Sequence, residues 1–200
     1  MRFDPKKQSP TENYIFMLYA IVPRPIAFIS TVGESGIFNL SPFSFFNGVC
    51  SDPPILSVSI AWKNGEKKDT LVNIENSKEF VVNIVTEPLA LAMNASSASF
   101  PPEVSEFQKV GLTPVPAAVV NAPLVKESPI NIECSLHRLI EVGAPPRGAT
   151  LVLGEIIQYH VREEVLENKK IDFQKLSAIG RMGGEFYART TDIFKLNRPR

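Results

Sequence analysis

The sequence has little cysteine, no excess of either charge and no long hydrophobic run. Cys50 and Cys134 lie far apart and form no CxxC pair, which excludes a disulfide-rich scaffold and a thiolate zinc site. One distant disulfide between them stays open. Lys plus Arg and Asp plus Glu each number 21, so the formal net charge is zero, which argues against a broad nucleic-acid-binding surface. No apolar window reaches the roughly 18 residues of a membrane span, and the first ten residues lack the apolar segment of a signal peptide. We therefore expect a cytoplasmic protein that binds neither nucleic acid nor membrane.

What the chain does have is enough apolar material for one core. Of its 200 residues, 44% are hydrophobic and 21% are charged, so we expect residues 1–200 to form a single domain. Prolines number 17 against 11 glycines. This many prolines disfavours a helical bundle and favours short segments separated by stiff turns.

The hydrophobic pattern predicts several strands with a few small helices. Ser9, Pro10 and Glu12 predict a helix start with a capping box, and that helix should end before Pro23. Asp69 looks like the N-cap of a second short helix. Strands are expected at residues 25–32, 37–40, 55–61, 79–85, 130–137 and 151–162, and short helices at 69–76 and 88–95. Without regular crossover helices, an antiparallel barrel or sandwich is favoured over a Rossmann sheet.

Several common kinds of active site are missing from the sequence. There is no nucleophile elbow, P-loop or Rossmann glycine motif. His137 and His160 fall on the polar sides of expected strands without ligand spacing, so we interpret them as solvated residues and expect no metal site. Cys50 and Cys134 are interpreted as small buried residues without a redox role.

Three segments stand out from plain scaffold. Residues 39–47 mix aromatic rings with hydroxyls and amides, which suits a planar aromatic ligand; a core strand entering a turn is the alternative. Residues 67–70 place two lysines, an acidic residue and a hydroxyl at a helix start, which suits a phosphate, or form a solvated loop. Residues 180–187 hold several glycines beside Arg181, which suits close approach of a ligand, or form a surface turn before a last strand.

An ordered series of motifs between about residues 10 and 190 resembles the flavin reductase-like family, which includes flavoredoxin and the reductase component of nitrilotriacetate monooxygenase. The series includes PRPIA at 23–27, NLSPFSFF at 39–46, DPP at 52–54, KDTL at 68–71, MN at 93–94, EF at 106–107 and RMGG at 181–184. The resemblance implies a mainly β fold, an FMN-binding split barrel, which is a Greek-key antiparallel β-barrel with short helices. Such proteins are usually homodimers with the flavin near the subunit interface.

The resemblance also implies a set of cofactor-binding residues. The flavin ring is expected at residues 41–47 and the phosphate near residues 30–31 and 68–70. Arg24 and Arg181 are candidates for a phosphate, ring-carbonyl or substrate contact. The complete set is Arg24, Ser30, Thr31, Ser41, Pro42, Phe43, Ser44, Phe45, Phe46, Asn47, Lys67, Lys68, Asp69, Thr70 and Arg181.

The function implied is hydride transfer from NAD(P)H to bound FMN, with FAD as a further possible flavin substrate. Reduced flavin or electrons would then pass to a monooxygenase or another acceptor. The flavin carries this chemistry, which fits the lack of a catalytic acid, base or nucleophile in the sequence. Two alternatives stay open: a flavoredoxin-like electron carrier with little NAD(P)H activity, and a β-barrel that binds some other small molecule.

Overall fold

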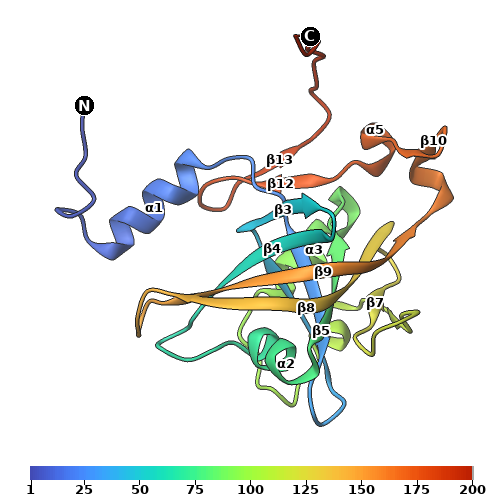
Figure 1. Cartoon of the computed structure of the whole chain (residues 1–200), viewed down its shortest axis with the longest axis horizontal. Helices are drawn as coiled ribbons and strands as arrows, with labels where there is room; N and C mark the ends of the chain where they lie inside the picture. Colours follow the sequence, from blue (N-terminus) through green and yellow to red (C-terminus); the bar gives the residue numbers. More distant parts are fainter. Residues whose placement is uncertain (200) are drawn as a thin grey trace.

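The computed structural model describes residues 1–199 and is built on one antiparallel seven-stranded sheet (Figure 1). The strand order is β2-β1-β5-β8-β9-β4-β3. These strands are β1 (Ala27–Val32), β2 (Phe38–Phe43), β3 (Phe46–Ser51), β4 (Pro54–Ala61), β5 (Glu79–Ile84), β8 (Ile130–Val142) and β9 (Ala149–Val161). Every pairing in the sheet is antiparallel, as the sequence predicts.

Short helices and small two-stranded sheets surround this framework. The helices are α1 (Pro10–Ala20), α2 (Asp69–Ser77), α3 (Ala90–Ser96), α4 (Glu106–Val110) and α5 (Phe173–Leu176), with 3-10 turns at Glu87–Leu89 and Glu163–Val165. The minor strands are β6 (Pro114–Val115), β7 (Leu124–Val125), β10 (Leu166–Glu167), β11 (Lys170–Ile171), β12 (Ile179–Arg181) and β13 (Tyr187–Arg189). Within residues 1–199, no helix is both long and apolar enough to cross a membrane.

The main core lies inside the curled sheet. Along β4, Leu56, Val58 and Ile60 are buried, while Ser57 and Ser59 on the other face are partly exposed, which confirms the predicted alternation. Gly154 of β9 is required by this packing. A Cβ there would lie 2.4 Å from the Phe80 ring, so any side chain would displace a buried aromatic residue.

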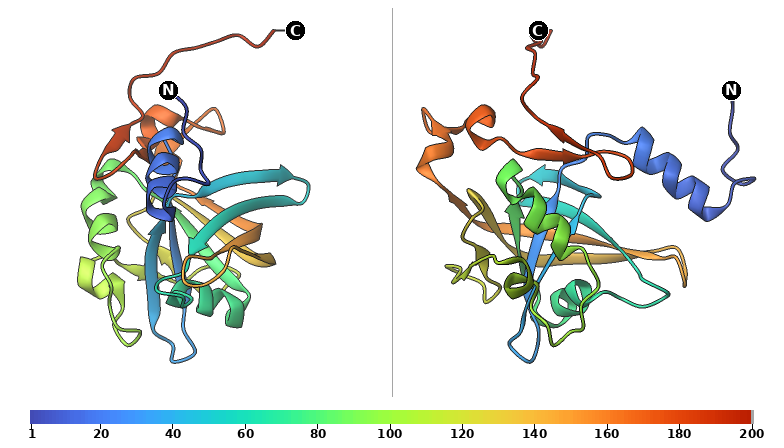
Figure 2. Two further views of the ribbon diagram at one scale, coloured as in Figure 1. Left: turned by 90° about the vertical axis from the view of Figure 1, so that its left-hand side faces the viewer. Right: turned by 180° about the vertical axis from the view of Figure 1, so that it is seen from behind.

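Helix α1 begins as predicted but lies beside the barrel rather than across it (Figures 1 and 2). Ser9 Oγ accepts the Glu12 N–H at 3.2 Å, and the Glu12 carboxylate accepts the Ser9 N–H at 2.7 Å. This closes the capping box. No residue of α1 is buried by the rest of the chain. The helix therefore presents an apolar surface that includes Tyr14, Phe16 and Tyr19.

The N-terminal end of α2 departs from the prediction. Lys68 is the N-cap residue and Asp69 is the first helical residue, so the predicted N-cap was wrong by one position. The Lys68 side chain makes no capping hydrogen bond at this end. The carboxylate of Asp69 still lies in the first turn, where the helix dipole favours a negative charge.

The second half of the sheet also differs from what alternation suggested. Strand β8 is longer than predicted, and both of its faces are buried at Ile130–Cys134 because the segment 114–125 covers the polar face. Glu133 is fully buried and His160 lies 2.5 Å from its carboxylate, so interpreting His160 as solvated was wrong. His137 is exposed, as predicted. Strand β3 was missed because its residues are mostly exposed and lack alternation.

The two cysteines have different environments. Both are free thiols, Cys134 buried and Cys50 exposed. Burial raises the pKa of the Cys134 thiol well above its usual range. The predicted burial is therefore confirmed for Cys134 and wrong for Cys50, which lies on the exposed strand β3.

Candidate functional site

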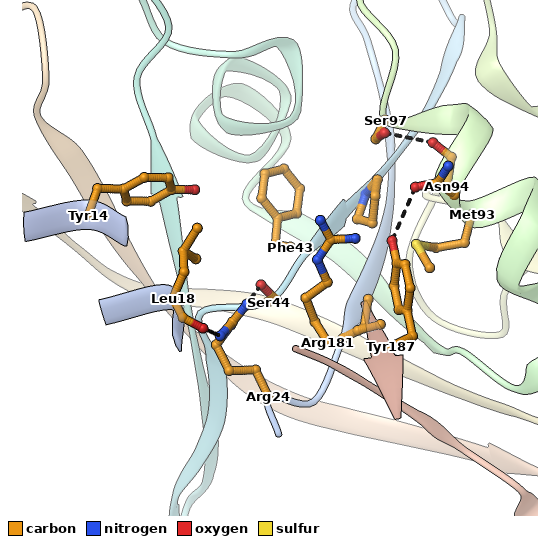
Figure 3. A pocket seen from close by; sticks show the side chains of 12 residues that line it. Tyr14, Leu18, Arg24, Phe43, Ser44, Met93, Asn94, Ser97, Arg181 and Tyr187 are labelled. Carbon is orange, nitrogen blue, oxygen red and sulfur yellow. Dashed lines mark hydrogen bonds between the residues drawn. The ribbon is translucent and has the colours of Figure 1, made fainter. Parts of the chain in front are cut away.

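A cavity lined largely by aromatic and apolar groups opens where α1, β2, α3 and the β12–β13 hairpin meet (Figure 3). We call it the aromatic pocket. Its volume is about 220 Å³. It is lined by Tyr14, Leu18, Arg24, Ile26, Pro42, Phe43, Ser44, Met93, Asn94, Ser97, Arg181 and Tyr187. Three of these, Pro42, Phe43 and Ser44, belong to the segment in which the sequence predicted a ring-binding site.

Arg24 borders this pocket, but most of its hydrogen-bond donors are already used. The guanidinium donates to the carbonyl oxygens of Leu18, Ile21 and Met182 at 2.6, 2.7 and 2.8 Å, and to Ser44 Oγ at 3.3 Å. Burial, and then the charge of Arg181, lower the pKa of Arg24. Arg24 therefore ties the end of α1 to the β12–β13 hairpin and shapes the wall of the pocket.

Arg181 is the more available cation in the aromatic pocket. Its guanidinium carbon lies 4.5 Å from the centre of the Tyr187 ring, a cation–π contact, and one terminal nitrogen donates to the Gly184 carbonyl. Tyr187 in turn donates from its hydroxyl to Asn94 Oδ1 at 3.1 Å (Figure 3). These contacts fix the positions of Arg181, Tyr187 and Asn94 beside one another in the lining of the pocket.

A second cavity, the cationic cleft, lies at the start of α2. Its volume is about 370 Å³, and it contains three lysines within six positions of the chain. It is lined by Asn39, Ser41, Lys63, Asn64, Glu66, Lys67, Lys68, Asp69, Thr70, Ser97, Ala98, Ser99, Phe100 and Glu106. All four residues of the predicted phosphate segment 67–70 are therefore in one cavity.

The two adjacent lysines of this cleft differ in how their charges are used. Lys67 Nζ pairs with Glu75 at 2.6 Å and with Glu141 at 2.9 Å, and these hydrogen bonds raise its pKa. Among residues 1–199, no carboxylate lies within ion-pair distance of Lys68. Loss of solvent around its ammonium, and then the nearby Lys63, lower its pKa. Of these two neighbours, Lys68 is therefore the one that an anion in the cleft would stabilise more.

The partly buried amide of Asn39 organises the floor of the cleft. Asn39 Oδ1 accepts the hydroxyl of Thr70 at 2.7 Å and, more weakly, that of Thr31 at 3.4 Å. Asn39 Nδ2 donates to Glu106 Oε1 at 2.9 Å. The network joins β1, β2, α2 and α4, so the position of Thr70 depends on three other elements.

Glu106 is the acidic end of this network, and it is only 7% exposed. Besides the Asn39 amide, its carboxylate accepts the Leu40 backbone N–H at 3.0 Å. Burial raises the pKa of Glu106, as does the charge of Asp69, while the bond from Leu40 lowers it. The net shift is upward, so the site holds this negative charge at a cost.

The two cavities are neighbours along one edge of the sheet. Strand β2, the first strand in the sheet order, contributes Asn39 and Ser41 to the cleft and Pro42 and Phe43 to the pocket, and Ser97 lines both cavities. Lys68 Nζ lies 5.5 Å from the centre of the Phe43 ring. Together the two volumes fall within the roughly 300–1,000 Å³ range of small-molecule sites.

Not every predicted site residue reaches these cavities. Ser30 and Thr31 are fully buried. Ser30 donates to the Pro123 carbonyl, and Thr31 accepts from Asn73 Nδ2 at 3.0 Å, so both hydroxyls serve the interior. Phe45 packs edge-on against Tyr14, Phe46 packs against the core, and Asn47 is exposed on β3. The structure brings the remaining predicted residues to one cavity or the other.

Several lining residues were missed by reasoning from the sequence. Tyr14 comes from a helix whose aromatic residues look like an ordinary apolar face. Asn94 and Glu106 lie in motifs of the family resemblance, MN and EF, but nothing in their local sequence marks them as site residues. Tyr187 lies within the glycine-rich segment 180–187, where only Arg181 was chosen.

Comparison with known proteins identifies the family. A family model described as the flavin reductase like domain matches residues 18–177. This chain belongs to the flavin reductase-like family. Its fold matches flavin reductase split-barrel proteins, which confirms the predicted fold class.

Solved structures support the same assignment. Nitrilotriacetate monooxygenase component B from Bacillus cereus is 37% identical, with 98% of each chain covered and a TM-score of 0.94. The 2-nitrobenzoate 2-nitroreductase of Pseudomonas fluorescens is 30% identical, covering 100% of this chain and 96% of that one, with a TM-score of 0.91. Flavoredoxin of Desulfovibrio vulgaris, at 22% identity, covers 98% and 97% of the two chains with a TM-score of 0.78, and so shares the fold.

Proposed function

We propose that this protein binds FMN across the aromatic pocket and the cationic cleft and transfers a hydride from NAD(P)H to it. The observation that carries the proposal is Lys68, which has no acidic partner among residues 1–199 and lies between the two cavities. Its ammonium group would neutralise a phosphate in the cleft, next to the Phe43 ring that lines the aromatic pocket.

The residues present fit such a ligand at its phosphate end. Lys68 supplies charge, the start of α2 supplies backbone N–H groups, and Lys63, whose Nζ donates to Ser99 Oγ at 2.6 Å, adds a second positive charge. Lys67 contributes less, because its charge is shared with Glu75 and Glu141. Lys63 and Lys68, which have no carboxylate within ion-pair distance among residues 1–199, would therefore be the principal charges on one phosphomonoester.

The residues at the ring end fit a flat heteroaromatic group. Phe43, Tyr14 and Tyr187 supply apolar faces, and Arg181 supplies donors that remain after its bond to Gly184. Donors near a ring carbonyl would stabilise negative charge that develops on the ring. Arg24 holds the wall in place rather than offering a free charge.

A bound flavin would supply the redox chemistry, accepting a hydride from the nicotinamide and passing electrons onward. The chain itself would bind and orient the two partners and limit water in the pocket. No protein acid or base is needed for this role. FAD as an alternative flavin substrate is part of the proposal, as is either nicotinamide as donor.

We propose further that reduced flavin or electrons pass to a partner protein. Nitrilotriacetate monooxygenase component B is, by its name, one component of a monooxygenase, which supports an acceptor of that kind.

We also propose that the protein is a homodimer, because α1 exposes Tyr14, Ile15, Phe16 and Tyr19 beside the aromatic pocket. Size-exclusion chromatography with light scattering, run at several protein concentrations, measures the molar mass and so tests the dimer. A monomer mass at every concentration would overturn it.

The decisive experiment follows the visible spectrum of the purified protein with FMN, before and after anaerobic mixing with NADH or NADPH. Bound FMN should show quenched fluorescence, and its absorbance should bleach rapidly with at least one donor. Bound FMN that neither donor bleaches would favour the electron carrier instead. FMN that stays free would overturn the proposed function.

A further inference from the structure

Glu106 controls which way the Asn39 amide faces. An ionised carboxylate only accepts hydrogen bonds, so the group of Asn39 that meets Glu106 Oε1 at 2.9 Å must be its NH2. The other oxygen of Glu106 is taken by the Leu40 N–H at 3.0 Å. The backbone N–H is fixed by β2 and cannot turn. The hydrogen bonds among Leu40, Glu106 and Asn39 therefore have only one consistent polarity, by which we mean which group donates and which accepts.

The polarity passes from Asn39 to Thr70. With its NH2 toward Glu106, Asn39 turns Oδ1 toward the Thr70 hydroxyl, 2.7 Å away. A carbonyl oxygen only accepts, so Thr70 must donate its single proton to Asn39. The hydroxyl of Thr70 therefore offers the cationic cleft lone pairs and no proton.

We propose that Glu106 is a positioning residue that, through Asn39, withholds the Thr70 proton from an anion in the cationic cleft. The cleft then holds a phosphate by lysine charge and backbone donors, without a hydrogen bond from the Thr70 hydroxyl in the first turn of α2. This inference rests on the proposed function, because it assumes that the phosphate of a flavin binds there. Its consequence is a looser grip on the phosphate than these residues could provide.

The variant Glu106→Gln should reverse the polarity without changing the shape of the side chain. The Leu40 N–H must meet the glutamine oxygen, so the glutamine NH2 faces Asn39. Asn39 must then turn over and present its own NH2 to Thr70, which accepts it and is free to donate into the cleft. The phosphate gains one hydrogen-bond donor and loses a nearby negative charge.

The experiment measures the ratio of riboflavin to FMN dissociation constants, which isolates the contribution of the phosphate. In the natural protein, Thr70→Val should change this ratio less than about twofold. In the Glu106→Gln background, Thr70→Val should reduce the ratio by about fivefold, the value of one hydrogen bond. A purely structural role of Glu106 would weaken both flavins equally and leave the ratio unchanged.

Two control variants separate charge from polarity. Glu66→Gln removes a carboxylate from the same cleft without touching Asn39. In that background, Thr70→Val should again have little effect. Thr70→Ser keeps the hydroxyl and should match threonine in every background. A fivefold effect of Thr70→Val in both the natural and Glu66→Gln proteins would overturn the proposal.

A second readout does not need a flavin. In NMR spectra of the ligand-free protein, contacts between the Asn39 side-chain amide protons and Thr70 should strengthen in Glu106→Gln. Identical contacts in both proteins would overturn the proposed polarity. If FMN and riboflavin bind to no variant, the proposed function fails, and this NMR comparison alone decides the role of Glu106.

Discussion

Glu106 and Glu133 are both buried carboxylates, yet they differ in how many hydrogen-bond partners surround them. Glu133 accepts the backbone N–H groups of Ala118, Val119 and Val120 at 2.8, 2.7 and 2.9 Å, and His160 lies 2.5 Å away. Glu106 accepts one backbone N–H and one side-chain amide.

The pKa values respond in opposite directions. Burial would raise the pKa of Glu133, but the bonds from His160 and three backbone donors outweigh it, and the net pKa is lowered. For Glu106 burial dominates, and the pKa is raised. A carboxylate with four hydrogen-bond partners stabilises the fold, whereas one that has only two among residues 1–199 and borders a cleft is available to influence a ligand.

The largest expected effect is on the Glu133 side of this comparison. Glu133→Ala would leave three backbone N–H groups and His160 without their acceptor, so the free energy of unfolding should fall by about 3–4 kcal/mol. Urea denaturation measures it. Glu79→Ala is the matched control, because Glu79 accepts a single N–H, that of Asn121 in the same segment. Equal losses for the two variants would contradict the special role of Glu133.

On the ligand-facing side, Ser44→Trp should affect binding rather than stability. Ser44 lines the aromatic pocket and accepts a long hydrogen bond of 3.3 Å from Arg24. A large side chain there should exclude the ring and weaken FMN binding by about a hundredfold, near 2.7 kcal/mol. Fluorescence titration gives the affinity and thermal melting tests the fold, with Ser44→Ala as control. Retention of flavin by the tryptophan variant would place the ring elsewhere.

A smaller loss should follow from removing one lysine of the cleft. Lys68→Ala should weaken FMN binding by at least about tenfold, or 1.4 kcal/mol, and leave riboflavin binding nearly unchanged. Lys67→Ala is the matched control and should cost less, because two carboxylates already share its charge. Isothermal titration of both flavins measures these affinities. If Lys67→Ala had the larger effect, Lys68 would not be the principal phosphate contact.

The smallest effect is the most direct test of the contrast between the two carboxylates. Because the pKa of folded Glu133 lies below its ordinary value of 4.5, its ionised form stabilises the fold above 4.5 and that stability is lost as pH falls below it. For Glu106 the folded pKa lies above 4.5, so stability is lost as pH rises through the interval above 4.5.

Denaturation of the natural protein, Glu133→Gln and Glu106→Gln across this pH range should therefore give difference curves of opposite slope. The advantage of the natural protein over Glu133→Gln should shrink on acidification. Its advantage over Glu106→Gln should shrink on alkalinisation. Slopes of the same sign would show that the two environments do not differ in the way described.

Much of the framework was predictable because it depends on local pattern. Residues close together in the sequence determine the capping box at Ser9, the alternation in β4 and the hairpin of β1 with β2. The burial of Glu133 was not predictable, because the segment that covers it lies 13 to 15 positions away in the chain. The same applies to His160, which looked solvated until the pairing of β8 with β9 placed it beside that carboxylate.

By itself, the sequence determined a mainly antiparallel β fold with short helices and the absence of an excess charge, and it predicted the two segments proposed to bind a ring and a phosphate. Those features depend on composition and short-range pattern. Only the tertiary structure decided which cations are free, because Lys67 and Lys68 are neighbours in sequence and differ only in what the fold brings to each. It also buried Ser30 and Thr31 and joined Glu106 to Thr70 through Asn39. Hydrogen-bond polarity depends on partners from several elements, so it exists only once those elements have packed.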